Sequence, residues 1–256
     1  MIIERLGFGD FFADMKHTLA LAPVGTSVKE SLLSVARKTL SPPQRALVRS
    51  LATELKIWHY HQKGIRKIRR GGLSKPSRLH LGCGNICKSD FLNIDLLPGG
   101  DLTLDLRKGL PFQSNCCEII FSEHFFEHID YPEPISYLLG ECLRVLRPGG
   151  VLTFSVPDTE WPLLDYRDGP NASYFQACAE NPWWHPPYCT TRLEHINYHF
   201  RQHGQHLFAY DEETARKLLE SVGFDHVVKR AYQPDLDSER RRIGGLFMSA
   251  MKRAVG

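Results

Sequence analysis

The sequence predicts an α/β fold built on a mostly parallel sheet. An apolar run at residues 78–81 leads directly into a glycine-rich turn, Gly82-Cys83-Gly84. A carboxylate, Asp95, stands at the end of the next apolar run. Strand-like and helix-like segments then alternate to the C-terminus. A glycine-rich turn between two strands lets a ligand approach bare main chain, so this segment also predicts a binding site.

Seven short runs have the composition of strands. They cover residues 78–81, 91–94, 102–104, 118–122, 151–156, 227–231 and 245–250. Helices are expected at 132–146, before an Arg-Pro-Gly-Gly turn, and at 211–222, between a capping Asp211 and Gly223. The connection at 82–90 is shorter than a usual crossover, so its helix is expected to shrink to about one turn.

Residues 1–76 differ from the rest and are expected to form an N-terminal helical extension, followed by one domain at 77–256. Helices are expected at 27–40 and 44–68, with Pro42 and Pro43 between them. The second helix ends in a basic cluster of Lys63, Arg66, Lys67, Arg69 and Arg70. This cluster is either a solvated helix end or a contact for an anion such as a phosphorylated substrate, an acidic lipid or RNA.

The composition is that of an ordinary globular protein. The formal net charge of +3 over 256 residues is too small to imply a nucleic-acid partner. No apolar run reaches the roughly 18 residues that span a bilayer, and the charged N-terminus is a poor signal peptide. Seven cysteines without a Cys-x-x-Cys pair predict reduced thiols in the cytoplasm and no zinc site.

Five sequence blocks in order, at residues 79–84, 93–96, 105–112, 122–128 and 143–150, resemble those of class I S-adenosylmethionine-dependent methyltransferases. The likeness covers residues 77 to about 251. It implies a Rossmann-like sheet of seven strands, mostly parallel with the last strand antiparallel, and helices on both faces. It also implies the cofactor S-adenosyl-L-methionine, with S-adenosyl-L-homocysteine as product. The short first connections resemble a bacterial subgroup near sugar and cell-envelope biosynthesis.

The resemblance implies a set of cofactor contacts at the carboxyl edge of the sheet. They are His80, Gly82, Cys83, Gly84, Asp95, Asp105, Leu106, Ser122, Glu123 and His124. The glycine turn would line the methionine part, Asp95 would accept the ribose hydroxyls, and Asp105 with Leu106 would flank the adenine. Residues 122–124 would lie where the methyl group meets its acceptor. Two departures are His80, where the family often has an acidic residue, and Ile86, which replaces the third glycine.

Residues 157–210 form a long insertion after the fifth strand, rich in tryptophan, tyrosine and histidine. It is expected to be either a lid over an acceptor pocket or a packed irregular cap. His195 and His199 have the i, i+4 spacing of a metal pair, but no acidic residue lies between them, and no metal is expected. A general base for a hydroxyl acceptor is expected instead, with His128 and His199 as first candidates and His124 beside them.

The resulting hypothesis is a methyltransferase acting on an oxygen or nitrogen of a small molecule, such as a sugar or a phosphorylated or nucleotide-linked cell-envelope precursor. An RNA or protein methyltransferase that docks through the basic helix is an alternative. So is a cofactor-binding scaffold without transfer activity. The amphipathic N-terminal helices could pack on the domain or form a homodimer.

Overall fold

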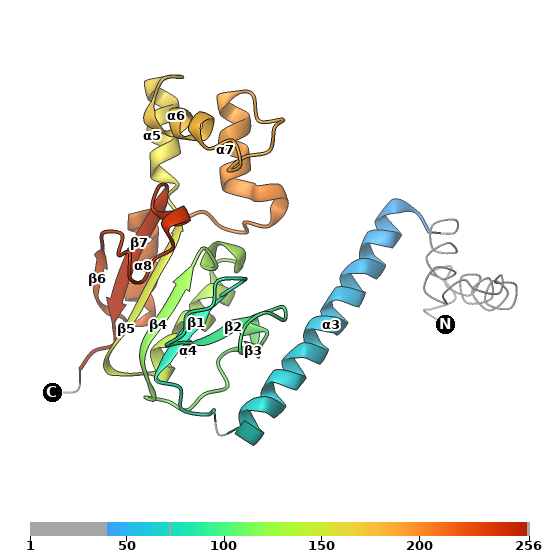
Figure 1. Ribbon diagram of the computed structural model, residues 1–256, viewed down its shortest axis with the longest axis vertical. Coiled ribbons are helices and arrows are strands. Elements are labelled where there is room, and N and C mark those ends of the chain that lie inside the picture. Colours follow the sequence, from blue (N-terminus) through green and yellow to red (C-terminus); the bar gives the residue numbers. More distant parts are fainter. Residues whose placement is uncertain (1–39, 72, 255–256) are drawn as a thin grey trace, which may run out of the picture. The chain divides into compact units, whose positions relative to one another are not determined.

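The computed structural model describes residues 40–71 and 73–254 (Figure 1). The expected helix at 27–40 therefore lies outside the described residues, apart from its last position. The chain divides into two compact units, residues 1–56 and 57–256. No helix in the described ranges is long and apolar enough to cross a membrane.

Helix α3 spans Pro42–Gly71, and its second half belongs with the sheet. Gly64 makes this close contact possible, because a Cβ at this position would lie 2.3 Å from the carbonyl oxygen of Thr103. The Nζ of Lys67 donates to the carbonyl of Asp101 at 2.8 Å. Lys67, a member of the basic cluster, therefore forms a hydrogen bond within the domain.

The seven strands form one sheet in the order β3-β2-β1-β4-β5-β7-β6. Their bounds are Arg78–Leu81 (β1), Leu92–Asp95 (β2), Leu102–Thr103 (β3), Cys117–Glu123 (β4), Leu146–Pro157 (β5), Asp225–Lys229 (β6) and Gly245–Met251 (β7). The pairs from β3 through β5 are parallel, whereas β7 runs antiparallel to both β5 and β6. The predicted mostly parallel sheet with an antiparallel last strand is confirmed.

One face of the sheet carries the main core, with α4 (Glu133–Val145) and α8 (Glu212–Val222) packed against it. Ile135, Leu138, Leu139 and Cys142 are at most 2% exposed and form the i, i+3, i+4, i+7 stripe of α4. Asp211 caps α8 by accepting from the backbone of Thr214 at 2.8 Å. Both helices begin and end within two residues of their predicted bounds.

The other face is covered near β1 and β2 by the connection at residues 82–91. This connection folds as turns, so the expected single helical turn is wrong. The reason is the buried side chain of Asn93, which accepts from the backbone N of Lys88 at 2.8 Å and donates to its carbonyl at 3.0 Å. These bonds take main-chain groups that a helical turn would use.

The insertion between β5 and α8 contains α5 (Glu160–Asp168), α6 (Ser173–Glu180) and α7 (Arg192–Arg201), which group together beyond one end of the sheet (Figure 1). A second small core joins them around Tyr174, Phe175 and Cys178. The insertion begins and ends at one place, because Asp158 forms a β-bridge with Tyr210. We call residues 158–210 the cap.

Candidate active site

The carboxyl ends of β1, β2 and β4 meet at the edge of the sheet that faces the cap. Leu81 is in register with Ile94 of β2 and with Ser122 of β4. Gly82 follows Leu81 and Asp95 follows Ile94, so these two residues lie side by side at this edge of the sheet. This is the edge at which open α/β sheets bind ligands.

The glycine turn leaves room for a ligand beside its main chain. Gly84 has φ +51°, and a Cβ built there would meet no atom within 4 Å. The backbone N of Gly84 donates to Oδ2 of Asp95 at 2.8 Å, and the backbone N of Leu97 donates to Oδ1 at 3.0 Å. A carboxylate has about four acceptor positions, so two remain for a pair of hydroxyls.

Three of the other predicted contact residues have buried side chains bonded within the protein. Ser122 is 0% exposed, and its hydroxyl donates to the carbonyl of Leu81 at 3.2 Å. His80 contacts Oδ1 of Asn93 through Nδ1 at 3.2 Å, and burial lowers its pKa to about 4, so the ring is neutral at pH 7. Cys83 is 4% exposed. Their side chains support the turn rather than line its open side.

Asp105 and Leu106 follow β3. The Asp105 carboxylate is buried and accepts from Nε and Nη2 of Arg107 at 2.8 and 3.0 Å. Leu106 is 4% exposed and belongs to the main core. Glu123 accepts from the backbone N of Ser238 at 2.8 Å and from its hydroxyl. Glu123 therefore holds the segment before β7 against the end of β4. The adenine contact of Asp105 and the cofactor contact of Glu123 stay predictions.

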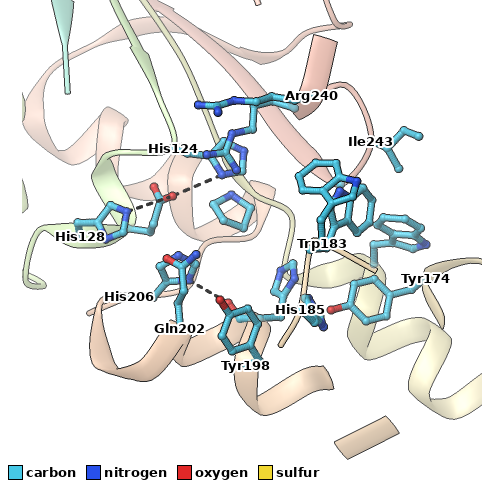
Figure 2. A pocket seen from close by; sticks show the side chains of 17 residues that line it. His124, His128, Tyr174, Trp183, His185, Tyr198, Gln202, His206, Arg240 and Ile243 are labelled. Atoms are coloured by element: carbon cyan, nitrogen blue, oxygen red, sulfur yellow. Dashed lines mark hydrogen bonds and ion pairs between the residues drawn. The ribbon is translucent and has the colours of Figure 1, made fainter. Parts of the chain in front are cut away.

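A pocket of about 270 Å³ opens between this edge and the cap (Figure 2). Its lining comes from the end of β4, the 3₁₀ turn Phe126–His128, the cap and the segment before β7. The residues are His124, Glu127, His128, Pro157, Trp161, Tyr174, Trp183, Trp184, His185, Tyr198, His199, Gln202, His206, Arg240, Arg241, Ile243 and Gly244. Few charged groups among many aromatic ones are typical of a small-molecule site.

The Glu127 carboxyl is an acidic group that burial strongly perturbs in this pocket. It is 1% exposed, and neither of its oxygens has a hydrogen-bond partner. Oε1 lies 3.6 Å from Nδ1 of His124 and 3.9 Å from Nε2 of His128, and dashed lines in Figure 2 mark both contacts. Burial raises its pKa from 4.5 to about 8, so the carboxyl titrates close to neutral pH.

His124 stands in a constrained position immediately after β4. Its φ is +50°, a left-handed conformation unusual for a residue with a Cβ, and its backbone N donates to the carbonyl of Ser155 at 2.8 Å. Burial holds its pKa well below the ordinary value, and its Nε2 has no partner. The strain places a neutral imidazole in the pocket beside Glu127.

Two further histidines have their tautomer set by main-chain carbonyls. Nδ1 of His128 donates to the carbonyl of Gln205, and Nδ1 of His206 to the carbonyl of His199, each at 2.9 Å. In the neutral form of such a ring Nε2 is the acceptor, and burial lowers the pKa of His206 to about 4. His199, on α7, has an unpartnered Nε2, and burial lowers its pKa to about 3.

The structure thus brings His124, His128 and His199, predicted from different parts of the chain, to one pocket. Sequence reasoning missed Glu127 and His206. The signal for Glu127 was present, because it is an acidic residue inside an aromatic block, three residues after His124 and next to His128. His195, the expected i, i+4 neighbour of His199, does not line the pocket and contacts Nδ1 of His185 through its own Nδ1 at 2.7 Å.

Residues 98–154 match the family model of a methyltransferase domain. No curated protein matches the chain significantly. Solved structures similar to it include a SAM-dependent methyltransferase from Thermotoga maritima, described as a possible histamine N-methyltransferase (12% identity, 81% of this chain and 97% of that chain, TM-score 0.40). Another is a SAM-dependent methyltransferase from Archaeoglobus fulgidus (15% identity, 75% of this chain and 94% of that chain, TM-score 0.39). A third is phosphoethanolamine N-methyltransferase 2 of Haemonchus contortus in complex with S-adenosyl-L-methionine (13% identity, 84% of this chain and 61% of that chain, TM-score 0.43).

The family match covers the segment from the end of β2 into β5, including β3, β4 and α4. The surrounding sheet has the seven strands and the antiparallel last strand that the resemblance implied. A methyltransferase-domain model thus matches residues 98–154, and this segment lies within a mostly parallel seven-stranded sheet.

Proposed function

We propose that this chain transfers the methyl group of S-adenosyl-L-methionine to an oxygen or nitrogen of a small molecule bound in the pocket under the cap. The observation that carries the proposal is the unpartnered, buried carboxyl of Glu127 among neutral histidines, beside the edge that bears the glycine turn. A buried titratable group with a strongly shifted pKa in a pocket is typical of an active site.

The residues at the edge fit this cofactor. The open space at Gly84 admits a ligand against the main chain, and Asp95 keeps acceptor positions for the ribose hydroxyls. The bound cofactor supplies an activated methyl group on a sulfonium, so the protein has to position the acceptor and take up its proton. His80 offers no carboxylate for the cofactor's amino group, which leaves main-chain carbonyls of the turn for that contact.

The ionised form of Glu127, which forms as the pH approaches its pKa, is a suitable destination for the proton of the acceptor. A base is most effective when its pKa is near the working pH, and burial brings this carboxyl to about 8. The Nε2 atoms of His128 and His199 are the alternative acceptors, in line with the sequence prediction. A base that acts through Glu127 predicts a loss of transfer in Glu127→Gln that exceeds the loss in His128→Ala or His199→Ala.

The lining favours an acceptor with both apolar faces and negative charge. Trp161, Trp183 and Trp184 offer flat apolar surfaces of the kind that cover the faces of a sugar ring. Arg240 and Arg241 line the same pocket, and Nε of Arg241 is buried without a partner. Guanidinium groups suit phosphate, so a sugar or a phosphorylated, nucleotide-linked envelope precursor is the proposed acceptor class.

The test of the cofactor site is calorimetry of S-adenosyl-L-homocysteine binding. Asp95→Ala should bind about 10-fold more weakly or worse, because losing an acceptor for charge-assisted hydrogen bonds costs about 1.5–3 kcal/mol. Asp90→Ala, at an exposed carboxylate in the connection between β1 and β2, is the matched control. Unchanged affinity in folded Asp95→Ala would refute the assignment. Asp95→Asn, which keeps one acceptor oxygen for the turn, separates ligand contact from support of the turn.

A further inference from the structure

The cap contains a cluster of metal-ligating side chains away from the proposed proton acceptor. Cys178 is on α6, His185 follows in the connection to α7, and His195 is on the first turns of α7. One ligand atom from each lies within 4.8 Å of the other two. His185 also lines the pocket, whereas Cys178 and His195 are behind it.

The distances in the cluster are close to those of a tetrahedral zinc site. Nδ1 of His185 lies 2.7 Å from Nδ1 of His195 and 3.9 Å from Sγ of Cys178. Zinc bonds of about 2.0–2.1 Å to nitrogen and about 2.3 Å to sulfur give separations of roughly 3.4 Å between two nitrogens and 3.6 Å between sulfur and nitrogen. Shifts of less than about 1 Å, within reach of side-chain rotation, would therefore seat the ion.

The protonation states suit a metal as well. Burial lowers the pKa of His185 to about 4, and the pKa of His195 is lowered for the same reason, so both rings are neutral at pH 7. Neutral imidazole is the metal-binding form. The thiol of Cys178 is protonated without metal, so binding of Zn²⁺ forms the zinc–sulfur bond and releases one proton to solvent.

We propose that Cys178, His185 and His195 bind a zinc ion that joins α6, the connection at 181–191 and α7. The fourth position belongs to Cys189 or to water; Cys189 is buried in the cap and lies near enough for its charge to raise the pKa of Cys178. The ion would fix the wall of the pocket that carries Trp183, Trp184 and His185. The sequence prediction of no metal rested on the cysteine spacing and on the pair His195 and His199, of which His199 lines the pocket.

A second group of possible ligands, Glu127, His128 and His206, also has its atoms within 4.8 Å. The cap cluster is favoured because it contains a thiol, the ligand that selects zinc over magnesium or calcium. Its two imidazole Nδ1 atoms also face each other directly, whereas those of His128 and His206 are held by main-chain carbonyls. Zinc bound at the cap cluster would be lost in a variant of Cys178, whereas zinc bound in the pocket would be lost in a variant of Glu127.

The experiment uses the full chain, freed of metal by a chelator and then titrated with Zn²⁺ or Co²⁺. One equivalent of zinc per chain by elemental analysis is expected, and Co²⁺ should give a thiolate charge-transfer band. Cys178→Ser should weaken the thiolate band, or abolish it where Cys178 is the single sulfur ligand. His195→Ala should lose the bound equivalent of metal, and circular dichroism reports whether each variant is folded. Cys116→Ser, at the start of β4, is the matched control and should keep both.

Four outcomes would overturn the proposal. They are no stoichiometric zinc in the wild-type chain, no thiolate band with Co²⁺, unchanged zinc in Cys178→Ser, or loss of zinc in Glu127→Gln with retention in Cys178→Ser. The last would place the ion in the pocket. With zinc absent, the short contact between His185 and His195 would be an ordinary hydrogen bond between neutral imidazoles. Cys189→Ser then decides the fourth ligand, because a weaker thiolate band means that two sulfurs bind.

Discussion

Replacing Glu127 by glutamine removes a buried titratable carboxyl while keeping its size. Glu127 is 1% exposed, and its oxygens have no hydrogen-bond partner, so the folded protein favours the neutral acid. Glutamine is neutral at every pH. The substitution should therefore change how stability depends on pH more than it changes packing.

The magnitude follows from the two pKa values. The folded state keeps the proton up to about pH 8, whereas the unfolded chain releases it near the ordinary value of 4.5. Between these values the folded state binds more protons, so the free energy of unfolding of the wild type falls as pH rises, by about 1.4 kcal/mol per pH unit. Over the whole window the carboxyl costs the wild type about 5 kcal/mol. Glu127→Gln lacks this cost.

The assay is urea unfolding of both proteins at pH 5, 6, 7, 8 and 9. The difference in free energy of unfolding, variant minus wild type, should grow steadily from pH 5 to 8 and then level off. The contribution of His80, which lies in β1 away from Glu127, is common to both proteins and cancels. Glu180→Gln, at an exposed carboxylate, should show no such trend. Parallel pH profiles for wild type and Glu127→Gln would refute the claim that this carboxyl is held neutral.

Gly84→Ala adds a methyl group in open space, so we expect a folded protein that binds S-adenosyl-L-homocysteine more weakly by calorimetry; equal affinity would move the ligand away from this turn. Gly82→Ala would place a Cβ 2.4 Å from Cγ of Phe125, and urea unfolding should show a loss of about 1–3 kcal/mol or more, from overpacking and from φ +67°. Asp237→Ala leaves Arg230, 9% exposed, without the carboxylate 2.6 Å away. The loss should be about 3–5 kcal/mol, and a loss below about 1 kcal/mol would show that water reaches the arginine.

The strands and the two sheet-packing helices could be predicted because their signals are local. Apolar runs of four to seven residues mark β1 and β4, and a capping Asp211 with Gly223 marks the ends of α8. The connection after β1 could not be predicted in the same way. Its turns depend on a side chain from β2, Asn93, and a sequence pattern within residues 82–90 carries no information about that partner.

The site was predictable to the level of residue type and position in the chain. His124, His128 and His199 were found because histidines at strand ends and in an insertion are visible in the sequence. Glu127 gains its importance from burial alone, since an exposed glutamate there would titrate normally. The contacts of His195 depend on how α7 is rotated against α6, which the i, i+4 spacing does not determine.

The cap begins and ends at one place on the sheet. Asp158 and Tyr210 form one β-bridge, and the carbonyl of Tyr210 accepts from both the backbone N and the hydroxyl of Thr159, at 3.2 and 2.6 Å. The chain therefore leaves and re-enters the domain through neighbouring residues, whatever the length of the segment between them. Segments of other lengths and sequences can occupy that place without disturbing the strands, so the insertion is a natural unit for exchanging acceptor specificity by grafting.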